Sequence, residues 1–485
     1  MSIDTLYDDH VAQPAAKVEI YWSDVTGWVD ETSRLSSGGL RIDRSLQNPL
    51  RSLGRLGQAP IGTASIEVQN ADGRYSAAKP GSQANIYGIF NKKIRISLGY
   101  SSDLTVAFVG RITGVRESET SVEATLVCRD LGEDVARQAV RTSLATQQTT
   151  RDWIETLLNA AGYTPGAGDL EKSHCVIPYA YAEKDNAWDE LNQAAASEAG
   201  VLFTDKSGSI RFWAYTHWLT ESVVYSWDGD FYQELVPERD YFSTYNVVTV
   251  EYEPRQEAAA AVVYQLHRAL HIPPGESRSE TLTFRFPLTE FTGYEMAAVT
   301  GGGEDISADV SISPASPASA QTWEIEFTNN NTRHEAFITK FNVTGRALVG
   351  RPSESYTADP NSVSGSADAK ELSTRGNWYV QTPEQARLLA DLIQYRLSTP
   401  PMVLRLRGLP CNPNLELGDK ISVSGAQTGV NTTAVVIGIS ISGMIPLVMD
   451  VTAVDYSYFY EHADSEYFLI GTSHLSTADG GRCVY

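Results

Sequence analysis

The sequence is poor in cysteine and has no long apolar run. Its 4 cysteines are far apart in 485 residues and include no C-x-x-C pair, which argues against a disulfide framework. We therefore expect reduced thiols at Cys128, Cys175, Cys411 and Cys483. The most apolar stretch, residues 434–449, is interrupted by glycine, serine and proline. It favours strands and a turn, so we expect no membrane span.

Positive charge is also scarce. The chain has 38 Lys and Arg against 60 Asp and Glu, a formal net charge of −22, which is opposite to that of a duplex nucleic-acid binder. Residues 1–130 hold 14 basic and 15 acidic side chains, so nearly all of the excess negative charge lies after them. The N-terminal part can therefore approach acidic partners, whereas the rest repels them.

Common catalytic motifs are missing, including G-x-S-x-G, the Walker loop and a G-x-G-x-x-G between a strand and a helix. His334-Glu335 begins like a zinc-protease motif, but no second histidine follows. His267 and His271 are four residues apart and could share a helix face as metal ligands; a strand would instead make them ordinary surface histidines, and no third ligand is near. We predict no catalytic, cofactor-binding or metal residue and no cofactor.

Two charged clusters leave alternatives open. Glu304, Asp305 and Asp309 lie near a Gly-rich loop and could bind calcium through oxygen, but their spacing is not that of an EF-hand and a solvated acidic loop is favoured. The second cluster is a group of arginines without regular strand periodicity or interleaved aromatics, which would either dock on an acidic neighbour or remain solvated. Its members are Arg34, Arg41, Arg44, Arg51 and Arg55.

Apolar and polar residues alternate through much of the first 130 residues. Ala64, Ile66 and Val68 are separated by polar neighbours, and the same period recurs at 94–98 and 122–126. A period of two places one strand face in a core. With glycine-bearing turns between the runs, the pattern predicts an antiparallel barrel or sandwich.

Helical periodicity appears in three places. One helix is predicted after Thr149, ending at Gly162, and another over residues 185–200. The third begins at Thr382-Pro383-Glu384-Gln385, which combines an N-cap, a proline at the first helical position and a glutamine three residues after the cap. Strand patterns return between about 240 and 350 and again after the third helix.

Four segments together resemble a known family. They are Gly62 to Ser76 (GTASIEVQNADGRYS), Phe108 to Val115 (FVGRITGV), the α+β insert containing Trp188 to Trp213, and Pro383 to Val423. In this order they resemble the trimeric tail-hub, or baseplate-hub, proteins of tailed bacteriophages, which are often called minor tail proteins in siphophages.

The resemblance implies a mainly β fold with α+β insertions: two tail-tube-like β-barrels, an α+β domain and a β-sandwich domain. The expected parts are an N-terminal arm (1–15), the first barrel (16–130), an inserted α+β domain (131–238), a sandwich-like domain with its connecting strands (239–370), the second barrel with a helix (371–455) and a C-terminal arm (456–485). This arm is rich in aromatic residues, and we expect it to dock on a neighbouring subunit or tail protein.

The implied function is structural and not enzymatic. A homotrimer would form a ring at the tail tip, between a distal tail protein or tail-tube ring above and a tail-fibre or central-spike protein below. It would adapt the six-fold tube to three-fold tip proteins and help form the channel through which genomic DNA is ejected without specific binding. Assembly is expected in the host bacterial cytoplasm. The alternative is a receptor- or carbohydrate-binding adhesin of the tail tip, which clustered exposed tryptophans would favour.

Overall fold

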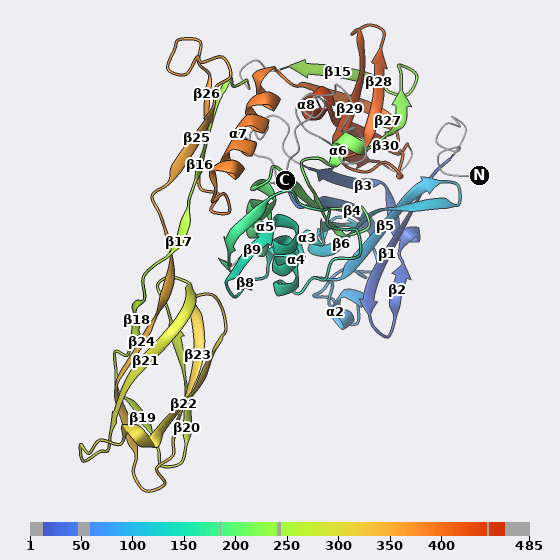
Figure 1. The fold of residues 1–485 in the computed structure, drawn as a ribbon. Coiled ribbons are helices and arrows are strands. Elements are labelled where there is room, and N and C mark those ends of the chain that lie inside the picture. The colour runs from blue at the N-terminus through green and yellow to red at the C-terminus, as the bar shows by residue number, and fades with distance from the viewer. Residues whose placement is uncertain (1–12, 47–58, 185, 240–243, 444–445, 461–485) are drawn as a thin grey trace.

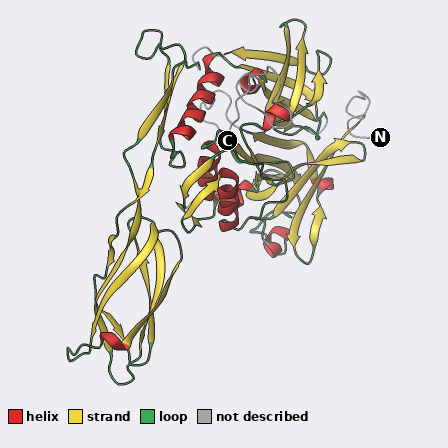
Figure 2. Ribbon diagram, viewed as in Figure 1, coloured by secondary structure: helices red, strands yellow, loops and turns green. Residues whose placement is uncertain are grey.

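The computed structural model describes residues 13–46, 59–184, 186–239, 244–443 and 446–460. Most of the regular structure is strand, as Figure 2 shows, which confirms the mainly β prediction. Figure 1 shows a larger body and an elongated sandwich to one side of it. Within the described ranges, no helix combines the length and apolar character needed to cross a membrane.

Seven strands from the first 130 residues form one half of a 13-stranded sheet. They are β1 (Pro14–Ser23), β2 (Gly27–Asp30), β3 (Leu35–Ser45), β4 (Thr63–Gln69), β5 (Lys93–Tyr100), β6 (Asp103–Glu117) and β7 (Glu123–Asp130), with short helices η1 (Thr32–Arg34) and α2 (Gln83–Tyr87) between them. Their order is β2-β1-β5-β6-β7-β4-β3, and every pairing is antiparallel. The predicted alternation is confirmed at Ala64, Ile66 and Val68, which are buried, whereas Val122 is 60% exposed and precedes β7.

Strand β3 corrects the sequence interpretation of the arginine-bearing stretch. The stretch has no regular alternation across its glycines, yet it pairs with β4 through a register shift between Leu35 and Leu40. From Leu40 onward, Leu40, Ile42 and Arg44 are buried and alternate with more exposed residues. The irregularity thus absorbs the break in periodicity and returns the strand to the sheet.

Six strands from later in the chain complete the sheet. They are β14 (Val223–Trp227), β15 (Glu234–Arg239), β27 (Met402–Pro410), β28 (Lys420–Gly425), β29 (Val430–Ser442) and β30 (Val448–Asp455). Strand β29 has different partners on its two edges. On one edge its first part pairs with β28 and its last part pairs with β3, and on the other edge it pairs with β30. The β29–β3 ladder therefore joins the two halves of the sheet.

The two tube-like barrels remain a prediction. The second half has the order β15-β27-β30-β29-β28-β14, and the first half, without its edge strand β2, has the order β3-β4-β7-β6-β5-β1. Ranked along the chain, the six strands of each half are therefore arranged in the same order across the sheet. The halves differ at one pairing, since β14 and β28 are parallel whereas β1 and β5 are antiparallel. In the second half, strands β14 and β15 come from the end of segment 131–238 and pair with β28 and β27. The second half is thus assembled from segments on both sides of the sandwich in the sequence.

The chain between β7 and β14 forms an α+β unit with a core of its own. Its elements are α3 (Gly132–Ala136), β8 (Val140–Arg141), β9 (Ala145–Thr149), α4 (Thr150–Ala160), β10 (Val176–Ala180), β11 (Glu183–Lys184), α5 (Ala187–Ala196), β12 (Val201–Thr204), β13 (Ile210–Trp213) and α6 (His217–Thr220). Both predicted helices are present. The hydroxyl of Thr149 accepts a hydrogen bond from the backbone N–H of Asp152, and Asn186 caps α5.

The elongated body consists of two facing sheets. Strands β17 (Arg255–Glu257), β18 (Ala261–Gln265), β19 (Leu270–Ile272) and β21 (Leu288–Val299) pair with the long β24 (Ala336–Gly350). The second sheet contains β20 (Ser277–Thr283), β23 (Thr322–Asn329) and β22 (Val310–Pro317), the last preceded by η3 (Ser307–Asp309). Phe327, Phe341 and Val343 are fully buried in this separate core.

A narrow sheet connects the sandwich to the larger body (Figure 1). It contains β16 (Val247–Tyr252), β25 (Glu354–Ala358) and β26 (Glu371–Thr374), and α7 (Pro383–Ser398) packs against β16 and β25. The predicted capping box of α7 is present, with Thr382 and Gln385 satisfying each other's backbone N–H groups. The described chain ends in α8 (Ser457–Tyr460), where Tyr458 is buried in the main core. The rest of the predicted C-terminal arm, like residues 1–12, lies outside the described residues.

Candidate functional site at the sheet junction

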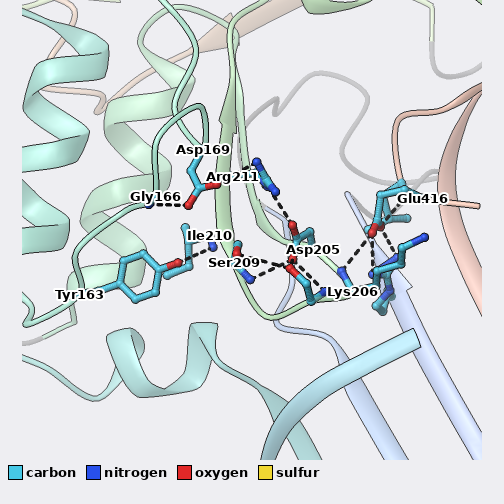
Figure 3. A network of polar contacts seen from close by, with 12 residues as sticks. Tyr163, Gly166, Asp169, Asp205, Lys206, Ser209, Ile210, Arg211 and Glu416 are labelled. Atoms are coloured by element: carbon cyan, nitrogen blue, oxygen red, sulfur yellow. Dashed lines mark hydrogen bonds and ion pairs between the residues drawn. The ribbon is translucent and has the colours of Figure 1, made fainter. Parts of the chain in front are cut away.

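The junction between the two halves of the sheet brings together charged groups that are far apart in the sequence. Arg44, on β3, has a side chain that is only 5% exposed, and its guanidinium binds the carboxylate of Glu416 in the loop before β28. The same carboxylate accepts a 3.0 Å hydrogen bond from the backbone N–H of Lys206, in the turn between β12 and β13. Glu416 thus links the α+β unit to both halves of the sheet (Figure 3).

The side chain of Lys206 fixes the loop that carries Glu416. Its Nζ donates to the carbonyl oxygens of Pro413 at 2.9 Å and Asn414 at 2.6 Å. Burial lowers the pKa of this ammonium. Within the same loop, the Glu416 N–H donates to Asp419 at 2.8 Å, and burial raises the pKa of Asp419 to about 6.

The turn that presents Lys206 is itself held by charge. The Asp205 carboxylate accepts hydrogen bonds of 2.9 Å from the backbone N–H groups of Ser207 and Ser209. Arg211 forms ion pairs of 2.8 Å with both Asp205 and Asp169. Figure 3 shows the resulting series of contacts from the α+β unit toward the sheet. The position of the turn is therefore set by several charge-assisted hydrogen bonds.

A second carboxylate, Asp130, lies at the end of β7 on the N-terminal side of the junction. It accepts hydrogen bonds from the backbone N–H groups of Gly62 and, at 2.8 Å, Gly132. Burial raises the pKa of Asp130 to about 7, although these N–H groups and nearby Arg44 act in the opposite direction. Asp130 therefore ties β7, the segment before β4 and the start of α3 together.

The geometry of this junction suits a structural role, which is to hold the α+β unit and the two halves of the sheet in a fixed arrangement. Its carboxylates bind N–H donors of the protein, and among the described residues no group of three or more His, Cys, Asp or Glu side chains is arranged to hold a metal ion. Buried charges of this kind are costly to leave unpaired. Loss of one partner would leave the other charge buried and unpaired, so each group of the network requires its partner at the junction.

The arginines that the sequence singled out divide into two sets. The described members each bind a carboxylate of the same chain: Arg34 binds Asp72 at 2.7 Å, Arg41 binds Asp43 at 2.6 Å, and Arg44 binds Glu416. Arg51 and Arg55 lie outside the described residues. For Arg44, the expected acidic neighbour is therefore a distant segment of its own chain.

The histidine and acidic candidates lie on the sandwich. His271 Nε2 is 2.9 Å from a carboxylate oxygen of Glu335, whereas His267 and His334 are exposed without joining that pair. In the acidic loop, Asp305 accepts hydrogen bonds from Ser307, and Asp309 accepts one of 2.8 Å from the side chain of Asn331. Glu304 is exposed.

The cysteine prediction is confirmed for the described part of the chain. Cys128, Cys175 and Cys411 are free and buried. Burial raises the pKa of the Cys175 and Cys411 thiols to about 12, so the thiol form dominates at neutral pH. Cys483 lies outside the described residues.

Comparisons with known proteins find similarity in structure and not in sequence. No protein-family model matches the chain, and no curated protein does. Among solved structures, the chain is similar to the 43 kDa tail protein of prophage MuSo2 from Shewanella oneidensis, with a TM-score of 0.51, 10% identity, and coverage of 92% of this chain and 99% of that one. It is also similar to a tail protein from Neisseria meningitidis MC58, with a TM-score of 0.50, 10% identity, and coverage of 91% and 96%.

These likenesses establish the class of fold. The chain has the mainly β fold of phage tail proteins, and it matches them over nearly their whole length. The resemblance found in four sequence segments is thereby confirmed at the level of the fold.

Proposed function

We propose that the chain is a structural phage tail protein that forms a homotrimeric hub at the tail tip. The observation that carries the proposal is the fold it shares, over nearly the full length, with two phage tail proteins. A ring of three copies, each contributing two β-rich halves, could offer six similar units to a six-fold tube and a three-fold surface to tip proteins. The Arg44–Glu416 junction supports this role because it holds the two halves together.

In this proposal the ring has a distal tail protein or the tail-tube ring above it and a tail-fibre or central-spike protein below it. Genomic DNA passes through its centre during ejection. Each copy brings a formal charge of −22, and acidic side chains that line a channel would prevent DNA from adhering to its wall. The hub has no catalytic task, and it occupies the virion tail tip after assembly in the host cytoplasm.

An adhesin role is the second candidate, favoured by an aromatic strip on the sandwich. Phe291 and Tyr294, on β21, are 39% and 51% exposed, and Trp323 lies 6.1 Å from Phe291 between ring centroids. Such rings could stack on sugars. Tryptophan burial opposes this role: among the described residues, Trp28 is the most exposed tryptophan, at 37%, and most of the others are core residues. Glycan binding that disappears in a Phe291→Ala, Tyr294→Ala variant would support the adhesin.

Electron microscopy of the purified full chain, combined with its native mass, tests the hub. We expect rings with three-fold symmetry and an open centre, formed either by the free protein or on addition to tail assemblies. A particle whose copy number is not a multiple of three would contradict the proposal.

A further inference from the structure

The inference concerns the surfaces through which neighbouring copies of the chain bind one another, and it rests on the proposed trimer. A closed ring of identical copies with three-fold symmetry uses a heterologous contact, in which one surface of each copy meets a different surface of the next. The β29–β3 ladder occupies the inner side of each half. Within the described chain, the sheet then ends at β2 in the first half and at β14 and β15 in the second. These ends are the candidates for contact between copies.

Beside β2 lies a cationic and partly apolar depression that also includes residues of β1, β5 and β6, which we call the β2 surface. It has a volume of about 660 Å³ and is lined by Tyr21, Trp22, Ser23, Asp24, Trp28, Asn91, Lys92, Lys93 and Arg111. Trp28 is 37% exposed, and Val25 and Phe90, which adjoin the lining residues in sequence, are 94% and 59% exposed.

Two lysines of the β2 surface carry unneutralised charge. Neither Lys92 nor Lys93 forms an ion pair with another described residue, whereas Arg111 binds Asp134 at 2.5 Å. The acidic member of the lining, Asp24, accepts a hydrogen bond of 2.9 Å from Tyr21. In a chain with a net charge of −22, this is a site where an acidic, apolar surface would be attracted.

The end at β14 has the complementary character, and we call residues 221–230 the β14 surface. Strand β14 pairs only with β28 among the described strands, so its other edge is open. Val223 and Val224 are 44% and 48% exposed. Glu221, Asp228 and Asp230 flank them, are exposed, and form no ion pair with a described residue.

Strand β15 is less suited to the contact. Its Glu234 and Glu238 already bind Arg407 at 2.9 Å and Arg405 at 3.1 Å. Pro237 also lies within the strand, and proline is typical of edges protected against further pairing. The unneutralised acidic charge is therefore at β14.

We propose that the β14 surface of one copy binds the β2 surface of the next copy around the ring. Val223 and Val224 then cover the aromatic part of the depression, while Asp228 and Asp230 face Lys92 and Lys93. The charge distribution along the chain agrees with this pairing. Basic and acidic residues are nearly equal in number in residues 1–130, which contain the β2 surface, whereas acidic residues are in excess after residue 130, where the β14 surface lies. Each copy supplies one surface of each kind, as a closed ring needs.

Charge reversal tests this contact in the full chain. A basic-side variant carries Lys92→Glu and Lys93→Glu, and an acidic-side variant carries Asp228→Lys and Asp230→Lys. Sedimentation should show association weakened by roughly tenfold or more in each, because attraction between exposed charges becomes repulsion. The effect should shrink in 1 M salt, where the Debye length is about 3 Å. A variant with all four changes should trimerise like the parent.

Two controls separate the contact from general charge effects. The Glu324→Lys, Glu326→Lys variant makes the same change in net charge as the acidic-side variant, but on exposed positions of the sandwich, and it should associate normally. An equal mixture of the basic-side and acidic-side variants should form alternating pairs but no closed trimers, because any ring of three contains at least one repulsive contact. Thermal melting checks that every variant is folded.

A zero-length carbodiimide cross-link provides a readout in assembled tails as well as in solution. Mass spectrometry should find Lys92 or Lys93 joined to Asp228 or Asp230, and mixed isotope labels should show that the two residues belong to different copies. Normal trimers in both reversed variants, together with wild-type trimers that lack this cross-link, would overturn the contact and leave the hub standing. Absence of trimers from the wild-type protein and from tails would overturn both.

Discussion

Replacement of Arg44 by methionine should weaken the association of the two sheet halves. The Arg44 side chain is 5% exposed and that of Glu416 is 19% exposed, so removal of the guanidinium leaves a carboxylate with reduced access to water. Breaking a buried ion pair costs about 3 to 5 kcal/mol. We expect a loss of about 3 kcal/mol, at the low end, because Glu416 retains the Lys206 N–H and some hydration.

The assay is urea unfolding of Arg44→Met, Glu416→Leu and the double variant, followed by tryptophan fluorescence. The double variant should recover much of the loss, since an apolar pair can replace a buried ion pair at little net cost. Hydrogen exchange should locate the weakening in β3 and β29, which pair at the junction. A loss below 1 kcal/mol in the free energy of unfolding of Arg44→Met, or a double variant no more stable than either single one, would refute the structural role of this ion pair.

Three further perturbations test other parts of the structure. Burial raises the pKa of Asp130 to about 7, whereas in the unfolded chain this carboxyl ionises near pH 4. Its contribution to the free energy of unfolding should therefore fall as the pH rises from about 4 to about 7. In urea unfolding, Asp130→Asn should flatten this pH dependence of the midpoint. At the base of the sandwich, Arg255 lies 4.7 Å from the ring centroid of Trp378. Arg255→Ala should cost about 1 kcal/mol of stability and speed proteolysis near β17. Unchanged cleavage would show that this cation–π contact does not hold the base of the sandwich. Thr382→Ala removes the cap of α7 and should cost about 1 kcal/mol in thermal unfolding, whereas Glu384→Asp, which keeps both the capping box and the negative charge of the first turn, serves as the control.

Local patterns predicted those elements whose causes lie within a few residues. Alternation identified β4 and β5, and the cap at Thr382 marked the start of α7 because the box is completed by Gln385 three residues later. The strand β3 was missed because its pairing depends on a register shift across glycines and on partners in β4 and β29.

The candidate site was beyond such reasoning. Arg44 and Glu416 are 372 positions apart, and nothing in the sequence around either residue identifies the other. Tyr379 likewise completes the core of the α+β unit from a segment that follows the sandwich. The resemblance to tail hubs predicted the fold because it used the order of several segments, whereas single motifs describe only strands and turns.

A cryo-electron microscopy reconstruction of a tail tip that contains this chain tests the central claim most directly. The account predicts three copies in a ring below the tail tube, with both sheet halves of each copy around an axial channel wide enough for duplex DNA. A different copy number, or an axis that stays closed by this protein in every state of the tail, would contradict it.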